Sequence, residues 1–121
     1  MKEISIIGVD LAKNVFQLHG AAADGTVLFR KKLSRTQFQR FMADHPPCLV
    51  VMEACGGAHH WARELEGAGH AVKLIAPRYV KPFIKRQKND AADAEAIVEA
   101  ALRPTMRYVE PKTGDQQARS I

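Results

Sequence analysis

The hydrophobic positions form short continuous runs in some parts of the chain and helically spaced stripes in others. Residues 4–9 and 48–53 are almost wholly apolar and rich in β-branched side chains, which predicts largely buried strands. Further strands are expected at 15–19, 26–32 and 71–75. Asp24-Gly25 is a hairpin turn signal between the second and third strands. The short connections predict that the first three strands form an antiparallel meander.

Helically spaced stripes predict three helices: from Ser34 to the prolines at 46 and 47, at 58–66, and at 89–102. Ser34 and Gln37 have the spacing of a capping box, and Pro46-Pro47 ends that helix. Between 76 and 88, Pro77 and Pro82 allow only turns or a partial helix. Because a helix precedes the strand at 48–53, that strand is expected beside the first one, parallel to it, through a right-handed crossover.

This order of elements is that of an RNase H-like α/β fold. It predicts a mixed five-stranded sheet flanked by helices, with the first three strands antiparallel. We expect one domain at residues 1–105. Residues 106–121 contain few core-building side chains and are interpreted as a truncated linker toward a missing C-terminal domain.

Composition excludes several classes of protein. The apolar fraction of 46% is ordinary for a globular domain, and no apolar run approaches the roughly 20 residues of a membrane span. Met1-Lys2-Glu3 leads directly into a strand without the pattern of a signal peptide, so we expect a cytoplasmic protein. Cys48 and Cys55 are the only cysteines, which excludes a disulfide framework and a four-cysteine zinc site. Zinc held by Cys55 with His59 or His60 stays open as a weak alternative.

Positive charge is concentrated in one acid-free stretch. The formal net charge is +5, and residues 73–88 contain Lys73, Arg78, Lys81, Lys85, Arg86 and Lys88. Such a stretch is usually a solvated surface, but this one runs directly into Asp90 and Asp93. A basic platform beside acidic residues suits a polyanionic substrate. The residues expected to contact nucleic acid are Lys13, Arg78, Lys81, Lys85, Arg86 and Lys88.

Four acidic residues lie where strands end or a helix begins. Asp10 closes the first strand and Glu53 closes the fourth, so parallel neighbours would bring both to one crevice at the carboxyl ends of the strands. At about 100° per residue, Asp90 projects near the middle of the apolar stripe of the third helix and Asp93 near its edge. Carboxylates crowded in this way repel one another unless cations lie between them.

Each acid also has a structural interpretation. Asp90 and Asp93 could cap their helix, Asp10 could cap the following turn, and Glu53 could pair with Lys13 or Arg63. All four at one crevice favour a site for Mg²⁺ or Mn²⁺ instead, because both ions prefer oxygen ligands. Two such ions, roughly 3.5–4 Å apart, could be bridged by Asp10 and carry out phosphodiester chemistry.

Three blocks of the sequence resemble a known family in its own order. They are Gly8-Val9-Asp10-Leu11-Ala12-Lys13, the run from Glu53 to Arg63 (EACGGAHHWAR) and the run from Val80 to Ala94 (VKPFIKRQKNDAADA). Together they are similar to the N-terminal domain of the DEDD transposases of bacterial insertion-sequence family 110, in its 1111 subgroup. The resemblance covers nearly the whole chain.

This resemblance implies a RuvC-like domain with Asp10, Glu53, Asp90 and Asp93 as the metal-binding catalytic set. It further implies DNA strand cleavage and exchange in transposition, guidance by a bridge RNA, a homo-oligomer, and a second domain with a serine nucleophile. The chain ends before that domain, so Ser120 is not that serine and the isolated fragment is expected to be inactive or weak. A non-catalytic DNA- or RNA-binding module and a stand-alone RuvC-like junction nuclease stay open as alternatives.

Overall fold

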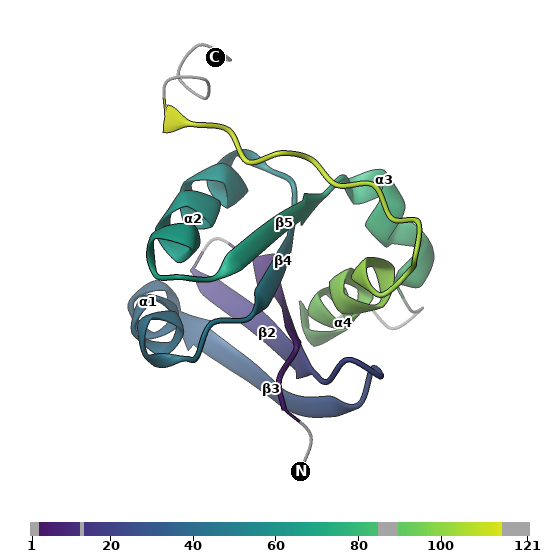
Figure 1. Ribbon diagram of the computed structural model, residues 1–121, viewed down its shortest axis with the longest axis horizontal. Coiled ribbons are helices and arrows are strands. Elements are labelled where there is room, and N and C mark those ends of the chain that lie inside the picture. The colour runs from purple at the N-terminus through teal and green to yellow at the C-terminus, as the bar shows by residue number, and fades with distance from the viewer. Residues whose placement is uncertain (1–2, 13, 85–89, 115–121) are drawn as a thin grey trace.

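A computed structural model describes residues 3–12, 14–84 and 90–114 (Figure 1). Its central sheet has five strands in the order β3-β2-β1-β4-β5. The strands are β1 (Ile6–Leu11), β2 (Val15–Ala21), β3 (Val27–Ser34), β4 (Leu49–Glu53) and β5 (Ala71–Ile75). The helices are α1 (Arg35–Asp44), α2 (Gly56–Gly67), the short α3 (Pro77–Val80) and 3₁₀ turn η1 (Lys81–Phe83), and α4 (Asp90–Ala101).

Strand directions agree with the predicted mixed sheet. β1 pairs antiparallel with β2, and β2 pairs antiparallel with β3. β1 pairs in parallel with β4, which pairs in parallel with β5. The predicted meander and the parallel crossover connection are therefore confirmed.

Local signals explain where the helices begin and end. Ser34 Oγ accepts a hydrogen bond from the Gln37 N–H at 3.2 Å, and Gln37 Oε1 accepts one from the Ser34 N–H at 2.9 Å. This reciprocal pair is the predicted capping box, which satisfies two amides at the start of α1. Gly69 has a φ of +99°, a conformation that glycine adopts without strain, in the turn after α2.

The helices divide between the two faces of the sheet, with α1 and α2 on one side and α3 and α4 on the other (Figure 1). The α1/α2 face has an aromatic core in which Phe16, Phe38 and Trp61 contact one another edge to face. Their ring centroids are 4.9 to 5.3 Å apart. Such contacts add to the free energy gained by burying the rings.

Small residues mark the closest contact between α4 and the sheet on the α3/α4 face. A Cβ atom on Gly8 would lie 2.6 Å from Val98 Cγ2 and 2.7 Å from the carbonyl oxygen of Ala94. Ala94, Ala96 and Ala100 of α4 are fully buried. Helix α4 therefore packs closer to β1 than any larger residue at position 8 would allow.

The segment after α4 crosses the β5 edge of the sheet toward α2 (Figure 1). The Val109 N–H donates to the Leu74 carbonyl at 2.7 Å in an isolated antiparallel bridge. The domain boundary at residue 105 stays a prediction. In the described part of the chain, no helix combines the length and the apolar character needed to cross a membrane.

Candidate functional site: carboxylates at one edge of the sheet

Asp10 lies on the face of the sheet that α4 covers. Along β1, Ile7 and Val9 belong to the core on the α1/α2 side, whereas Ile6 packs in the cluster on the α4 side and Gly8 contacts α4. Because side chains alternate along a strand, Asp10 follows Ile6 and Gly8 onto the α4 side. Its side chain is half-buried.

Glu53 reaches the same place from the neighbouring strand. Met52 packs on the α1/α2 side and Val51 on the α4 side, so Glu53 belongs to the α4 side. Val9 pairs with Met52 in the parallel register, and the next residues of the two strands are Asp10 and Glu53. The sheet thus places these two carboxylates side by side at the carboxyl ends of β1 and β4, as the sequence predicts.

Asp93, in the first turn of α4, is close enough to Glu53 to act on its ionisation. Burial is the largest cause that raises the pKa of the Glu53 carboxyl, and the negative charge of Asp93 raises it further. The positive charge of Lys81 opposes them and lowers this pKa. Two half-buried carboxylates and one lysine therefore share one electrostatic environment at this edge of the sheet.

The other predicted site residues are only partly described. The side chain of Asp90 lies outside the described residues, and so do Lys13, Lys85, Arg86 and Lys88. Among the described side chains, no three or more His, Cys, Asp or Glu residues form a group that could hold a metal ion. The chemistry of the donors nevertheless fits Mg²⁺ or Mn²⁺: they are carboxylate oxygens, and Glu53 and Asp93 repel each other where a divalent cation would relieve the repulsion.

Arg78 and Lys81 extend from the elements that follow β5, and both are exposed. The Arg78 guanidinium lies 4.9 Å from the ring centroid of Tyr79, and Arg78 NH2 donates a hydrogen bond to the Tyr79 hydroxyl at 3.5 Å. This hydrogen bond and the positive charge of Arg78 lower the pKa of Tyr79. A cationic and aromatic surface thus lies on the α3 side of the carboxylates.

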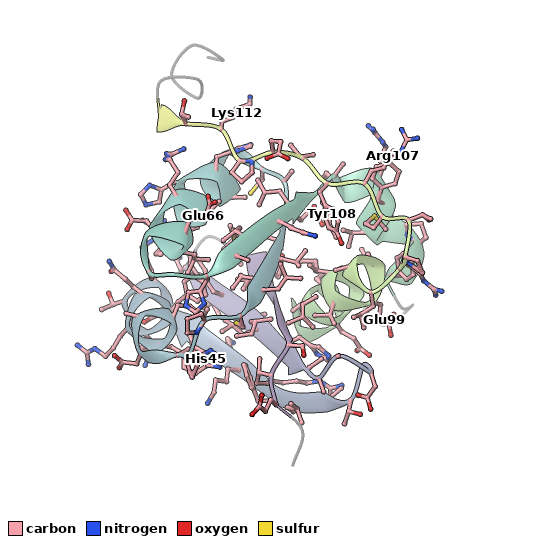
Figure 2. All side chains as sticks on the ribbon, in the orientation of Figure 1. His45, Glu66, Glu99, Arg107, Tyr108 and Lys112 are labelled. Atoms are coloured by element: carbon pink, nitrogen blue, oxygen red, sulfur yellow. The ribbon has the colours of Figure 1, made fainter. Side chains whose placement is uncertain are left out.

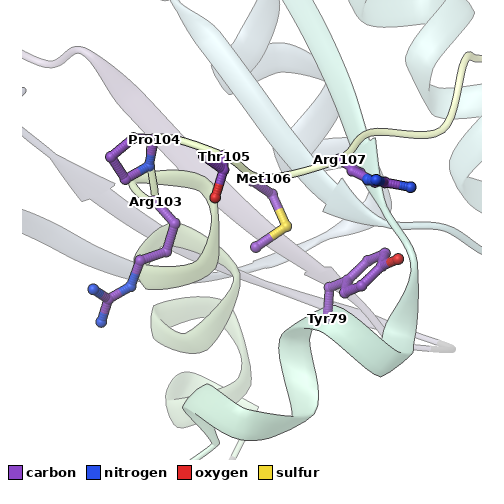
Figure 3. Close-up of a pocket in the computed structure, with 6 residues that line it drawn as sticks. All are labelled: Tyr79, Arg103, Pro104, Thr105, Met106 and Arg107. Carbon is purple, nitrogen blue, oxygen red and sulfur yellow. The ribbon is translucent and has the colours of Figure 1, made fainter.

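A cavity of about 300 Å³ adjoins this surface, between α3 and the segment after α4 (Figure 3). Its lining residues are Tyr79, Arg103, Pro104, Thr105, Met106 and Arg107. Arg103 also lies 5.2 Å from the ring centroid of Phe83. The sequence prediction missed Arg103 and Arg107 because they lie outside the basic stretch at 73–88, and only the fold brings them to Tyr79.

His59 holds the C-terminal segment in place. Its side chain is buried, and its Nδ1 accepts a hydrogen bond from the Lys112 N–H at 3.0 Å. Arg63 donates a hydrogen bond to the Lys112 carbonyl at 2.8 Å, so Arg63 also binds this segment. Burial, and then the charges of Lys112 and Arg63, lower the pKa of His59. These contacts give His59 and Arg63 a structural role, whereas His60 is exposed.

Comparison with known proteins gives a consistent result. The family profile of IS110-type DEDD transposases, described as "Transposase", matches residues 7–119. The chain is 52% identical over 120 residues to the transposase of insertion sequence IS1328 from Yersinia enterocolitica, covering 99% of this chain and 36% of that protein. It is 50% identical over 117 residues to the transposase of IS1111A from Coxiella burnetii, covering 97% and 32%. The chain thus spans about a third of the length of these relatives.

Among solved structures, Thermus thermophilus RuvC has the same fold. Its free structure gives a TM-score of 0.62 at 15% identity, covering 86% of this chain and 99% of RuvC. Its complex with a Holliday junction substrate gives a TM-score of 0.60 at 13% identity, covering 88% and 100%. The predicted RNase H-like, RuvC-like fold is confirmed.

Proposed function

The chain belongs to the IS110 family of DEDD transposases, and we propose that it is the part of such an enzyme in which metal-bound carboxylates cleave and exchange DNA strands. Asp10, Glu53, Asp90 and Asp93 are the proposed ligands. The observation that carries the proposal is the parallel register that sets Asp10 beside Glu53 at one edge of the sheet, with Asp93 near enough to raise the pKa of Glu53. A divalent cation at this edge would relieve the repulsion between Glu53 and Asp93, which solvent reaches only partly.

The ligand set suits two-metal phosphodiester chemistry. Mg²⁺ or Mn²⁺ held by these carboxylates would supply activation of an oxygen nucleophile and stabilisation of the leaving oxygen of a phosphodiester. Asp10 would hold the metal from the central strand of the sheet. Glu53 would bind a metal as a carboxylate, the form that the positive charge of Lys81 favours by lowering its pKa.

DNA is the proposed substrate, and the cationic side chains beside the carboxylates would bind its backbone. Arg78 and Lys81 are the described members of that set, and Lys13, Lys85, Arg86 and Lys88 are proposed from the sequence alone. Each phosphate that a lysine or arginine neutralises releases condensed counterions, so binding is expected to weaken with salt. A bridge RNA, a homo-oligomer and a C-terminal domain with a serine nucleophile belong to the proposal for the whole enzyme.

Calorimetric titration with Mn²⁺ tests the site. We expect the chain to bind Mn²⁺, with at least a tenfold loss of affinity in Asp10→Asn or Asp93→Asn, because each removes an anionic ligand. Glu66→Gln removes the same charge from the exposed surface of α2 and should bind as the unmodified chain does (Figure 2). Equal Mn²⁺ binding by the unmodified chain and Asp10→Asn would refute the site.

Two other functions make different predictions. A non-catalytic nucleic-acid-binding module would bind DNA equally well with and without a chelator and would not bind Mn²⁺ through Asp10. A stand-alone junction nuclease would cleave branched DNA without the rest of the protein, a possibility that the fold shared with RuvC makes worth testing. We expect this chain alone to cleave branched DNA weakly or not at all, because part of the proposed active site lies in another domain.

A further inference from the structure

A second basic segment, separate from residues 73–88, lies on β3 and the start of α1. Between Asp24 and Asp44 the chain contains no acidic residue, and its cations are Arg30, Lys31, Lys32, Arg35 and Arg40. All five are exposed. Because β3 is an edge strand, one side of it has no neighbouring strand in the described sheet.

The two lysines of β3 point to opposite faces of the sheet. Lys31 Nζ lies 5.5 Å from the ring centroid of Phe41 on α1, which places Lys31 on the α1/α2 face. Arg30 lies 4.0 Å from Glu95 of α4, on the opposite face. Since side chains alternate along a strand, Lys32 shares the face of Arg30, which is also the face of the carboxylates.

The register of the sheet places Lys32 in the same row as Asp10. Asp10 pairs with Gln17 of β2, and Gln17 pairs with Lys32 of β3. On the other side of Asp10, this row continues toward Glu53. At the usual strand spacing, the Cα atom of Lys32 is about 10 Å from that of Asp10, the rise of about three nucleotides of a DNA strand.

The start of α1 extends this row at the same edge of the sheet. β3 runs in the direction of β1, so its last residues and Arg35 lie at the carboxyl end of β1. A cavity of about 550 Å³ is found here, lined by Asn14, Ser34, Arg35 and Thr36. Its lining is polar and includes one cation, which suits a phosphate group better than an apolar ligand.

We propose that Gln17, Lys32, Arg35 and this cavity bind the backbone of the DNA strand whose phosphate enters the carboxylate site. The inference rests on the proposed function. In this arrangement, the strand has cations on both sides of the reacting phosphate: Lys32 and Arg35 on the β3 side, and Lys81 on the α3 side. Binding on both sides fixes the position of the scissile bond, because a strand held at one end alone can pivot away.

The test compares Lys32→Glu with Lys31→Glu, two adjacent substitutions with the same change of charge on opposite faces. The probe is a fluorescein-labelled single DNA strand of about 20 nucleotides. Anisotropy is measured in EDTA at several salt concentrations, so that metal binding plays no part. We expect Lys32→Glu to raise the Kd about tenfold and to reduce the slope of log K against log salt by about one, while Lys31→Glu binds nearly as the unmodified chain does.

Arg35→Glu keeps the result interpretable if Lys32→Glu folds poorly. An acidic residue in the first turn of α1 favours the helix, so this variant is expected to fold, and weaker DNA binding by its folded form then reports the lost cation. Equal DNA binding by the Lys31 and Lys32 variants, with unchanged binding by Arg35→Glu, would overturn the inference. The same variants are also tested with an RNA strand of the same sequence. If they weaken the binding of RNA but not of DNA, the inference is overturned and the surface is assigned to RNA.

Measurements of Mn²⁺ binding and of DNA binding distinguish a failure of this inference from a failure of the proposed function. If Mn²⁺ binding depends on Asp10 but Lys32→Glu binds DNA normally, the metal site stands and this inference fails. If Lys32→Glu loses DNA binding but Mn²⁺ binding does not depend on Asp10, the DNA surface stands and the metal site fails.

Discussion

The two faces of the sheet are packed with different kinds of side chain. Large aromatic rings fill the α1/α2 face, where Phe16, Phe38 and Trp61 pack edge to face. The other face has a smaller-volume core of aliphatic side chains and alanines, in which α4 approaches Gly8 of β1 closely. The proposed functional residues lie on the second face.

The difference shows how one sheet serves both stability and chemistry. Bulky side chains keep helices at a distance and bury a large apolar area, which stabilises the fold. Small side chains let a helix approach a strand closely, which brings an acid of that helix near an acid at a strand end. The proposed site therefore depends on the absence of a side chain at position 8, beneath α4.

Removing bulk from the aromatic face should have the largest effect on stability. We expect Phe38→Ala to lower the free energy of unfolding by about 3–5 kcal/mol, because Phe38 is fully buried between two other rings. Urea denaturation measures this loss. Phe29→Ala, at a partly buried position, is the control and should cost less. The folded fraction of Phe38→Ala should keep its Mn²⁺ affinity, and a weakened affinity would mean that the two faces are not independent.

Adding bulk to the other face should affect both stability and the site. Gly8→Ala forces the Ala94 carbonyl and Val98 to move, at a cost of about 1–3 kcal/mol. The displaced α4 should carry Asp93 away from Glu53 and weaken Mn²⁺ binding in calorimetry. Gly57→Ala is the matched control, because a Cβ there meets nothing within 4 Å. Unchanged Mn²⁺ affinity in Gly8→Ala would contradict the close-approach explanation.

The ionisation of Glu53 offers a smaller test of the crowded carboxylates. Its pKa is raised in the folded state, so its contribution to stability is fully present below the ordinary value of 4.5 and is lost as the pH rises through the folded value. Without metal, Glu53→Gln should therefore be more thermostable than the unmodified chain at pH 7, with the advantage shrinking toward pH 4.5. Melting curves in EDTA at both pH values measure it, and an advantage that grew on acidification would contradict the raised pKa.

The reactivity of the two cysteines tests whether the aromatic face stays closed in the folded protein. Cys48 packs against the aromatic face, and burial raises the pKa of its thiol to about 11. Cys55, just after the end of β4, is exposed. A disulfide reagent at pH 8 should therefore modify Cys55 quickly and Cys48 much more slowly, since the thiolate is the reactive form. Cys55→Ser should abolish the fast phase, and equal rates for the two thiols would show that the aromatic face opens readily.

The sequence could predict features that depend on neighbouring residues. The capping box of Ser34 and Gln37, the proline-limited helices and the alternation of β1 all rest on local sterics and hydrogen bonds. The crossover rule then placed β4 beside β1, and with it Glu53 beside Asp10. These steps suffice to predict the fold and to bring together two of the four proposed ligands, Asp10 and Glu53.

Contacts between distant residues could not be predicted in this way. The hydrogen bond between His59 and Lys112 spans 53 positions, and the cavity beside Tyr79 needs arginines from beyond α4. Neither has a local signal, because each depends on how the segment after α4 crosses the sheet. His59, named from the sequence as an alternative zinc ligand, instead accepts a hydrogen bond from this segment.

The sequence by itself determined the elements, their order and the alternation of side chains along each strand, because these follow from steric rules acting over a few residues. Only the tertiary structure decided that Asp93 approaches Glu53, and that Lys32 lies in the row of Asp10 while Lys31 faces α1. Those relations depend on the distance and angle at which a helix packs on the sheet and on the register between strands. Both are set by side-chain volumes and pairing across the whole core.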